Sequence, residues 1–426
     1  MASRCPKRKK VYTVLLPLRP SQPRVGVADV PMFTLVAAAA VALDNGFRLP
    51  QLGWNSWNHF GCGVTEQDIK DTADAFVATG MKAAGYACVN VDDCWMAMNR
   101  SADGKLTHDP VRFPAGMKAL SKYVHERGLK FGLYSARCGH TCQGRPGSED
   151  HEWTDAQTFA SWDVDYLKYD NCGSCKYGYS NTPAKVMQVT RMGDALRRWG
   201  AEGSGRPIFY STEMGGEQLF NADICNSARE GSDITASWES VLYELDVGSE
   251  YADLAKPGYH NDFDMLEVGN GRLTPQEEEA HMAIWCLMSS PLLAGNNLTA
   301  ATPEVVKILT APGPISVNQD ELALQGRLCG QGTDGAGGIW QAWAKPLADG
   351  ATAALLLNRN ASAAVNASVD FRACNVSRHA ASESVVTDLW SAATLGSYTS
   401  SWSAVVPPHS HRLVKIAPPA APLVVA

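Results

Sequence analysis

The sequence lacks an excess of positive charge. Lysine and arginine number 37 against 44 aspartate and glutamate residues, which leaves a net charge of −7. Such a balance gives no surface that would neutralise phosphates, so we expect no nucleic-acid binding. Of the 426 residues 45% are hydrophobic and 19% charged. This composition excludes a disordered chain and allows one large domain with a smaller second one.

Long apolar runs are also missing. The most apolar stretch is residues 30–43, which is shorter than the roughly 20 residues needed to span a bilayer. Basic residues precede it, and it ends in Ala40-Val41-Ala42, a small-x-small pattern typical of signal peptidase sites. We therefore expect no membrane span, and a signal or targeting segment over residues 1–42. An organelle transit peptide and translation from Met32 are the alternatives.

Cysteines and glycosylation acceptors favour the secretory pathway. The 12 cysteines are too few for a disulfide scaffold but more than a cytosolic enzyme usually keeps. Five acceptor sequences of the N-x-S/T type occur, at Asn99, Asn297, Asn360, Asn366 and Asn375. We expect an extracellular or vacuolar/lysosomal protein.

Short apolar runs alternate with helix-patterned stretches after Leu43. The predicted strands are 52–54, 86–91, 129–134, 164–169, 208–211, 224–227, a weak one near Met265, and 315–317. This βα alternation is typical of a parallel sheet, and eight units predict an α/β fold, the (β/α)8 TIM barrel. A doubly wound sheet is the competing fold, but no glycine-rich phosphate turn follows the first strand.

Helix starts and a change of pattern complete the expected organisation. Thr65 opens a Thr-x-x-Asp box before a helix to Lys82, and Pro275 suits the first turn of a helix over 275–289. Beyond Asp320, short apolar runs separated by Gly, Asn and Ser predict an antiparallel β-sandwich domain. We expect the barrel over residues 43–322, the β domain over 323–418 and a tail over 419–426.

Polar residues that follow barrel strands are the candidates for function, because active sites lie at the carboxyl ends of these strands. Carboxylates stand there at Asp92, Asp93, Asp170, Asp233 and Asp264, with Lys168 and Arg229 nearby. Each aspartate alone could cap a helix. Their convergence instead favours a pocket that binds sugar hydroxyls and performs acid–base chemistry.

Other catalytic groups are not apparent. The 10 histidines are scattered, and the C-x-x-C at Cys172 and Cys175 has no second pair at zinc-binding spacing. No G-x-S-x-G nucleophile elbow is present. We therefore expect no metal and no cofactor, and a pair of carboxylates as the catalytic groups.

Five motifs in this order resemble the α-galactosidases of glycoside hydrolase family 27. They are LDNG at 43–46, GWNSWN at 53–58, DDCW at 92–95, YLKYDNC at 166–172 and NQD at 318–320. The resemblance runs from Leu43 to about Pro418. It implies a retaining exo-glycosidase that removes terminal α-D-galactosyl residues from oligosaccharides, galactomannans or galactolipids. The sequence leaves the oligomeric state open.

The resemblance also implies roles for single residues. Asp170 matches the nucleophile and Asp233 the acid/base, two carboxyls that a retaining enzyme holds about 5–5.5 Å apart. Lys168, on the same face of its strand as Asp170, would keep that carboxylate ionised. The positions that match substrate contacts are Trp57, Asp92, Asp93, Tyr134, Lys168, Glu213, Arg229, Asp264 and Met265.

Within that pocket, Asp92 and Asp93 would bind the 4- and 6-hydroxyls of galactose, and Trp57 would cover its apolar face. Glu213 suits a free 2-hydroxyl, which argues against an α-N-acetylgalactosaminidase. A β-L-arabinopyranosidase of the same family remains an alternative. A non-catalytic galactose-binding protein is the alternative from another class, although Asp170 and Asp233 together argue against it.

Cysteine pairs and departures from the family pattern follow from the same resemblance. It implies disulfides Cys62–Cys94 and Cys142–Cys172, and a free thiol at Cys225, because Thr212 replaces the expected partner. Cys138 and Cys175 could form an extra bridge. The departures are Met214, Ala136 and the run 259–264. We expect them to alter the pocket rim, and hence substrate preference more than reaction type.

Overall fold

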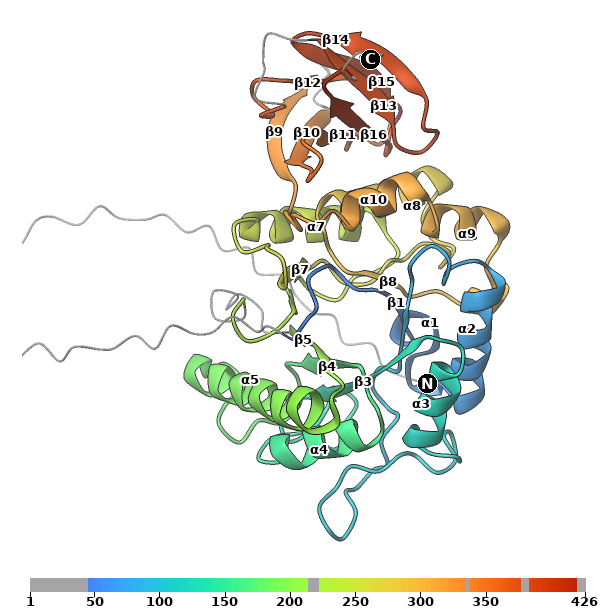
Figure 1. Ribbon diagram of the computed structural model, residues 1–426, viewed down its shortest axis with the longest axis vertical. Coiled ribbons are helices and arrows are strands. Elements are labelled where there is room, and N and C mark those ends of the chain that lie inside the picture. The colour runs from blue at the N-terminus through green and yellow to red at the C-terminus, as the bar shows by residue number, and fades with distance from the viewer. Residues whose placement is uncertain (1–44, 214–221, 334–337, 377–382, 420–426) are drawn as a thin grey trace, which may run out of the picture. The chain divides into compact units, whose positions relative to one another are not determined.

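The structure is a computed structural model that describes residues 45–213, 222–333, 338–376 and 383–419. Figure 1 shows helices around the first group of strands and a strand-rich C-terminal part in orange to red. The predicted targeting segment over 1–42, Met214 and the end of the tail lie outside the described residues. Within the described residues, no helix combines the length and apolar character that a membrane crossing needs.

Eight strands form one parallel sheet in the order β7-β6-β5-β4-β3-β2-β1-β8. They are β1 (Leu52–Asn55), β2 (Cys88–Asn90), β3 (Lys130–Ala136), β4 (Tyr166–Asp170), β5 (Phe209–Glu213), β6 (Ser227–Arg229), β7 (His260–Asp262) and β8 (Leu292–Ala294). A parallel bridge from Leu266 to Ala294 joins the segment after β7 to β8. This contact links the two edges of the sheet, so the predicted (β/α)8 barrel is confirmed.

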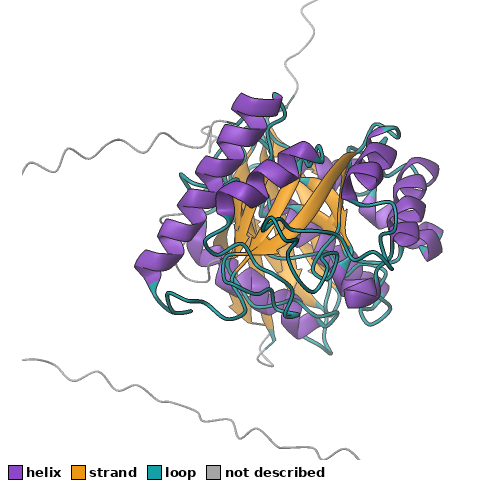
Figure 2. Cartoon of the chain, turned by 90° about the horizontal axis from the view of Figure 1, so that it is seen from below, coloured by secondary structure: helices purple, strands orange, loops and turns teal. Residues whose placement is uncertain are grey.

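Helices surround the strands, as Figure 2 shows. Those of the barrel are α1 (Trp57–Phe60), α2 (Glu66–Ala78), α3 (Met117–His125), α4 (Glu152–Ser161), α5 (Thr182–Leu196), α7 (Trp238–Gly248), α8 (Pro275–Leu287), α9 (Pro303–Leu309) and α10 (Pro312–Asn318). Short helical turns are η1 (Gly61–Gly63), η2 (Arg197–Ser204), η3 (Ser249–Tyr251) and η4 (Leu298–Ala300). The helices cover the strands with their apolar faces, which buries one continuous core.

Both predicted helix starts are confirmed. The hydroxyl of Thr65 accepts from the amide of Asp68, and the Asp68 carboxylate accepts from the amide of Thr65, so α2 begins with a full capping box. Thr274 and Glu277 form the same box at α8, with Pro275 in the first turn. The prediction carried α2 to Lys82, but the helix ends at Ala78 because Gly80 turns the chain away with a φ of 85°.

Three strand predictions are wrong in place. The predicted eighth strand, 315–317, lies within α10, because Pro312 and Pro314 suit a first helical turn and not a central strand. The eighth strand is β8, a short buried apolar run after α8. The sixth strand follows its predicted place by a few residues, and β7 precedes Met265.

The C-terminal part is an antiparallel β-sandwich, as predicted. One sheet has the order β14-β13-β16-β11-β10-β9, and the other pairs β12 with β15. The strands are β9 (Arg327–Thr333), β10 (Ile339–Pro346), β11 (Thr352–Asn358), β12 (Val365–Asp370), β13 (Ser384–Asp388), β14 (Thr394–Tyr398), β15 (Ser401–Val406) and β16 (His411–Ala417). A second hydrophobic core lies between the sheets and includes Leu356, Val369, Trp402 and Val414. The sequence did not predict β9, β12 and β14.

Candidate active site

The carboxyl ends of the barrel strands bring most of the predicted site residues together. Asp92 and Asp93 follow β2, Asp170 ends β4, and Glu213 ends β5. Arg229 ends β6, while Asp264 and Met265 follow β7. Because parallel strands share one carboxyl end, these residues of distant sequence position face one another.

Asp170 is buried and held at both oxygens. The hydroxyl of Tyr134 donates to Oδ2 at 3.0 Å, and the backbone amide of Asn171 donates to Oδ1 at 2.5 Å. Burial and the nearby Asp170 charge raise the pKa of Tyr134 well above its usual range, so the hydroxyl remains a proton donor. These donors fix the direction in which the carboxylate points.

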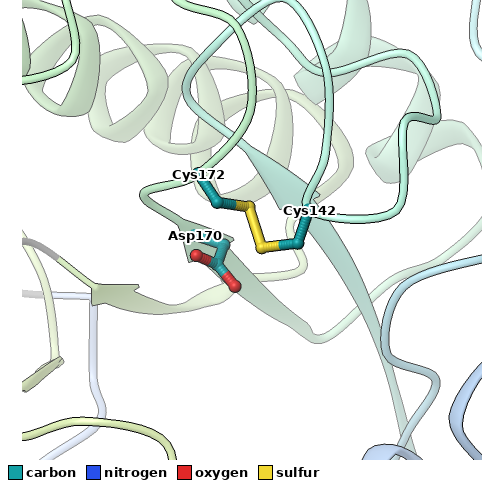
Figure 3. A group of neighbouring side chains, drawn as sticks. All are labelled: Cys142, Asp170 and Cys172. Carbon is teal, nitrogen blue, oxygen red and sulfur yellow. A yellow bond between two sulfur atoms is a disulfide. The ribbon is translucent and has the colours of Figure 1, made fainter. Parts of the chain in front are cut away.

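A disulfide lies beside this carboxylate. Figure 3 shows Asp170 next to the bridge between Cys142 and Cys172, which ties the loop after β3 to the loop after β4. Two cysteines and a carboxylate within reach of one another resemble a metal-binding set. The two sulfurs are bonded to each other, however, and metal binding to cysteine needs a thiolate. These three residues therefore do not form a metal site. The disulfide links the two loops beside Asp170.

The other predicted cysteine pairings also agree with the structure. Cys62 is bonded to Cys94, and the optional pair of Cys138 and Cys175 is formed. Cys225 is buried and forms no disulfide in the described part of the chain, and the hydroxyl oxygen of Thr212 lies 3.4 Å from its sulfur. A fourth disulfide, Cys329–Cys374, joins β9 to the turn after β12 in the β domain and was not predicted.

Asp92 and Lys168 form a charged pair at the base of the site. Nζ of Lys168 lies 3.0 Å from Oδ2 of Asp92, which also accepts from Nδ2 of Asn55 at 2.7 Å. Burial alone would lower the pKa of Lys168, but Asp92 and Asp170 raise it above its ordinary value. Lys168 is therefore cationic, and it acts on Asp170 through its charge.

Asp93 lies next in the chain and is held by backbone donors. Its Oδ1 accepts from the amide of Cys94 at 2.6 Å, and its Oδ2 accepts from the amide of Gln143 at 3.0 Å. Burial raises the pKa of Asp93 above its ordinary value. Burial removes water from this carboxylate. A sugar hydroxyl that donated to it would supply a hydrogen bond in place of the lost water.

Arg229 connects the ends of three strands. Its guanidinium lies 2.7 Å from Asp233, 3.2 Å from Asp264 and 3.4 Å from Glu213. Burial acts against the charge of Arg229, but the three carboxylates raise its pKa well above the ordinary value. Arg229 therefore stays charged and holds the carboxylates in place.

The pKa values of Glu213 and Asp233 are shifted in opposite directions. Burial raises the pKa of Glu213, although Arg229 opposes the shift. Desolvation also acts to raise the pKa of Asp233, but Arg229 outweighs it and the pKa lies below the ordinary value. The side chain of Asp233 is 80% exposed. Asp233 therefore stands at the mouth of the site, where a leaving group could reach it.

A cavity of about 630 Å³ opens above these residues. The predicted residues that line it are Trp57, Lys168, Arg229, Asp233, Asp264 and Met265. Glu213 lines a neighbouring cavity of about 10 Å³, which shares Lys168 and Arg229 with the larger one. That small cavity has room for about one water molecule.

Sequence reasoning missed several residues of the site. Asn55 ends β1 and donates to Asp92, so the strand-end rule that selected Asp92 would also have found it. Glu267 accepts from the side-chain amides of Asn58 and Asn270. This network joins α1 to the loop after β7, and no local pattern relates residues so far apart in sequence.

The expected change of the pocket rim is wrong for the seventh strand. Tyr259, His260 and Phe263 are buried, and Phe263 packs edge-on against Trp285 with ring centroids 5.7 Å apart. Burial lowers the pKa of His260 to about 3, so its ring is neutral. Because these aromatic side chains fill the barrel wall, the departure affects packing behind Asp264. Ala136, at the end of β3, is likewise buried.

Carboxylates at the strand ends of a barrel, facing a polar cavity, fit the class of glycoside hydrolases, which use a pair of carboxylates. Comparison with known proteins narrows this class. The "Alpha galactosidase A" family matches residues 49–320, and the "Alpha galactosidase C-terminal beta sandwich domain" matches residues 337–416. The chain is 40% identical to alpha-galactosidase 2 of Arabidopsis thaliana over 87% of this chain and 90% of that protein.

Solved structures agree. Alpha-galactosidase I from Mortierella vinacea is 33% identical, with a TM-score of 0.79 over 88% of this chain and 98% of that one. The alpha-galactosidase from Saccharomyces cerevisiae solved with raffinose is 30% identical, with a TM-score of 0.79 over 87% and 98% of the two chains. The chain belongs to the α-galactosidases of glycoside hydrolase family 27, which confirms the resemblance seen in the sequence.

Proposed function

We propose that the protein is a retaining exo-α-galactosidase that hydrolyses terminal α-D-galactosyl residues of small-molecule or polysaccharide galactosides. One observation carries the proposal: Asp170 is buried and oriented by two donors, whereas Asp233 is exposed at the mouth of a cavity that is also lined by Lys168, two residues before Asp170. Double displacement needs such a pair, one group to attack and one to exchange protons with water and the leaving group. The yeast relative solved with raffinose supports a galactoside substrate.

The reaction has two steps. In the first, an oxygen of Asp170 bonds to the anomeric carbon, the bond from that carbon to the leaving oxygen breaks, and Asp233 gives its proton to the leaving oxygen. In the second, Asp233 takes a proton from water, whose oxygen bonds to the anomeric carbon and displaces Asp170. Because Arg229 lowers the pKa of Asp233, the protonated acid is abundant only at acidic pH, and the rate falls as pH rises.

Recognition of galactose uses the buried polar groups. Asp92 and Asp93 would accept from the 4- and 6-hydroxyls, and Glu213 with Arg229 would contact the 2-hydroxyl. A sugar with the wrong configuration leaves such buried carboxylates without partners, which lowers its affinity. Trp57 would pack against the apolar face of the ring. The same contacts would disfavour the acetamide of α-N-acetylgalactosaminides.

We further propose entry into the secretory pathway, removal of residues 1–42 and domains over 43–322 and 323–418. Four disulfides support an oxidising compartment, extracellular or vacuolar/lysosomal. Among the acceptor asparagines, Asn99, Asn366 and Asn375 are exposed, which makes them the most accessible for glycan attachment. Asn297 and Asn360 are half-buried in local turns.

The experiment compares matched aryl substrates: an α-galactoside, an α-N-acetylgalactosaminide and a β-L-arabinopyranoside. We expect preference for the α-galactoside, and loss of hydrolysis with retained galactose binding in Asp170→Asn. Asp71→Asn, on the exposed side of α2, is the control and should behave as the unchanged protein. Galactose binding without turnover of any substrate would favour the non-catalytic alternative. Full activity of Asp170→Asn would show that Asp170 is not the nucleophile.

A further inference from the structure

Arg137 is a buried cation with no part in the two covalent steps of the proposed reaction. It directly follows β3 and is 0% exposed. Arginine does not give up its proton in proteins, so its charge remains when the side chain is buried. A buried charge is costly unless acceptors surround it. The positions of those acceptors therefore show what Arg137 holds in place.

The guanidinium of Arg137 donates in three directions. Nε donates to Oδ1 of Asn171 at 2.6 Å, and Nη1 donates to Oε1 of Gln188 at 2.8 Å. Nη2 donates to the backbone oxygen of Tyr179 at 2.7 Å. Asn171 and Tyr179 belong to the loop after β4, and Gln188 belongs to α5. The planar, rigid guanidinium therefore ties this loop at two points to the helix that follows it.

The peptide bond between Asp170 and Asn171 is held at both ends. Its oxygen accepts from the backbone amide of Arg137 at 2.9 Å. Its N–H donates to Oδ1 of Asp170 at 2.5 Å, and the Cα that follows carries the side chain bonded to Nε of Arg137. Because a peptide unit is planar, fixing its oxygen and the following Cα also fixes the direction of its N–H. Arg137 thereby acts on a donor that orients the Asp170 carboxylate.

The far side of this network is anchored as well. Nε2 of Gln188 donates to Oε1 of Glu149 at 2.8 Å, and the two oxygens of Glu149 accept from the backbone amide of Lys176 at 3.0 Å and 2.9 Å. Gln188 and Glu149 are both buried. A buried hydrogen-bond network of this kind makes its members rigid. The guanidinium of Arg137 is therefore fixed relative to the loops after β3 and β4.

We propose, on the basis of the proposed function, that Arg137 is a positioning residue for the nucleophile. Through Asn171 it holds the peptide whose N–H directs the carboxylate of Asp170 toward the anomeric carbon. Both covalent steps depend on that direction, because Asp170 attacks in the first and departs in the second. The groups that would bind the sugar hydroxyls, Asp92 and Asp93, follow another strand. Loss of Arg137 should therefore slow the chemistry and leave the sugar bound.

The test measures kcat for 4-nitrophenyl α-galactoside and, separately, the affinity for galactose. In Arg137→Met, which keeps an unbranched side chain but removes the donors, we expect kcat to fall roughly 10- to 100-fold with little change in galactose affinity. Asn171→Ala removes the acceptor between Arg137 and the nucleophile and should lower kcat to a similar extent. The double variant should be no slower than the slower single variant, because both changes break the same link.

Arg206→Met is the matched control. Its guanidinium lies 2.8 Å from the buried carboxylate of Asp165. Both residues precede strands, β5 and β4 respectively, and so lie at the opposite end of the barrel from the site. This variant should lose unfolding free energy, as Arg137→Met does, and keep the kcat of the unchanged protein.

The outcomes separate this proposal from the proposed function. If Arg137→Met loses stability but keeps its kcat, or loses galactose affinity to the same extent as kcat, Arg137 supports the fold and does not position Asp170. If Arg137→Met does not fold, Asn171→Ala decides, because it deletes only a side-chain amide, and an unchanged kcat there contradicts the proposal. In each of these cases the galactosidase assignment stands. If the unchanged protein does not hydrolyse the galactoside, both are wrong.

Discussion

Arg229 shows how single residues organise this site. It is 3% exposed, and it contacts one carboxylate each from the ends of β5 and β7 and from the loop after β6. A buried cation of this kind is stable only while its partners remain, because an unpaired buried charge costs several kcal/mol. Arg229 thus couples Glu213, Asp233 and Asp264. The sequence names all four residues as site candidates but does not show that Arg229 contacts the other three.

A second buried ionisable group, the carboxyl of Glu244, lies beside the loop that joins Arg229 to Asp233. Glu244 of α7 is 1% exposed, and its two carboxyl oxygens have no hydrogen-bond partner among the described residues. Gly231 leaves room for it, since a Cβ there would lie 1.7 Å from Oε2 of Glu244. Burial and the charge of Asp264 raise the pKa of Glu244 to about 8.

This carboxyl should make stability depend on pH. The folded protein keeps a proton on Glu244 that the unfolded chain releases, so the free energy of unfolding falls as pH rises from about 4.5 to about 8. The Glu244→Gln variant has no proton to release at this position, so its free energy of unfolding should not fall in this way. Urea unfolding should show the variant more stable than the unchanged protein by on the order of 2 kcal/mol at pH 7, and nearly equal to it at pH 5.

The matched control is Glu321→Gln, at an exposed carboxyl. It should show the same small difference from the unchanged protein at both pH values. A Glu244→Gln effect that does not change between pH 5 and pH 7 would mean that Glu244 is ionised in the folded protein.

The sequence holds a signal for the burial of Glu244. Val241, Leu245 and Gly248 are spaced at three and four residues and lie on the buried face of α7, and position 244 falls on the same face. A charged residue there predicts a buried ionisable group. By contrast, Asp92, Asp170 and Arg229 were predictable because each directly follows an apolar strand, where barrel enzymes place their polar groups.

At the scale of elements, disulfides fix the loops at the carboxyl ends of β3 and β4. Cys142–Cys172 lies beside Asp170, with Tyr134 Oη 3.4 Å and 3.5 Å from the two sulfurs. Cys138–Cys175 joins the same two loops and encloses the first bridge in sequence, so it is the outer bridge of the two. The inner bridge, Cys142–Cys172, therefore adds little to the loss of entropy in the unfolded chain, because Cys138–Cys175 already closes the loop. It holds the residues next to Asp170 in place.

Removing two different disulfides should separate activity from stability. Cys142→Ser with Cys172→Ser should lower kcat about tenfold at a small cost in stability, because the outer bridge still closes the loop. Cys329→Ser with Cys374→Ser opens a loop of 45 residues in the β domain. That change should cost about 4 kcal/mol of unfolding free energy and leave kcat unchanged.

The two double variants serve as controls for each other in thermal unfolding and initial-rate measurements. Equal loss of kcat in both would show that the inner bridge has no special relation to Asp170. If the variant without Cys142–Cys172 loses stability but keeps its kcat, this bridge stabilises the fold and does not position Asp170.

Element boundaries were predictable where pattern and length agree. Thr65 and Thr274 mark helix starts with complete capping boxes, and the structure confirms both. Strands of three residues, such as β6, β7 and β8, are too short to show a period in sequence. Their places are decided by pairing with neighbouring strands, so β8 was misplaced into α10.

At the scale of the whole molecule, the β domain is joined to the barrel through the segment around α8. Nζ of Lys345 in β10 donates to Ser289 at 2.6 Å, and Nδ1 of His409 lies 2.6 Å from Glu277. Both strands β11 and β16 contact α8. The β domain thus packs against α8, the barrel helix that follows the loop carrying Asp264 and Met265.

The order of barrel and β domain was predictable from the change in hydrophobic pattern after Asp320. Strands β9 and β14 were not predictable, because their residues are exposed or half-buried and show no apolar alternation, and β12 alternates over only six residues. Contacts across domains, such as that of Lys345 with Ser289, likewise have no local signal.

The proposed mechanism requires a covalent galactosyl intermediate at Asp170. The most direct test treats the protein with a fluorinated α-galactosyl substrate that forms this intermediate faster than water removes it, followed by mass spectrometry of the peptides. We expect a galactosyl-type adduct on Asp170, absent in Asp170→Asn, and α-galactose as the first product from unmodified substrates. An adduct on another residue, or β-galactose released first without any adduct, would contradict the account.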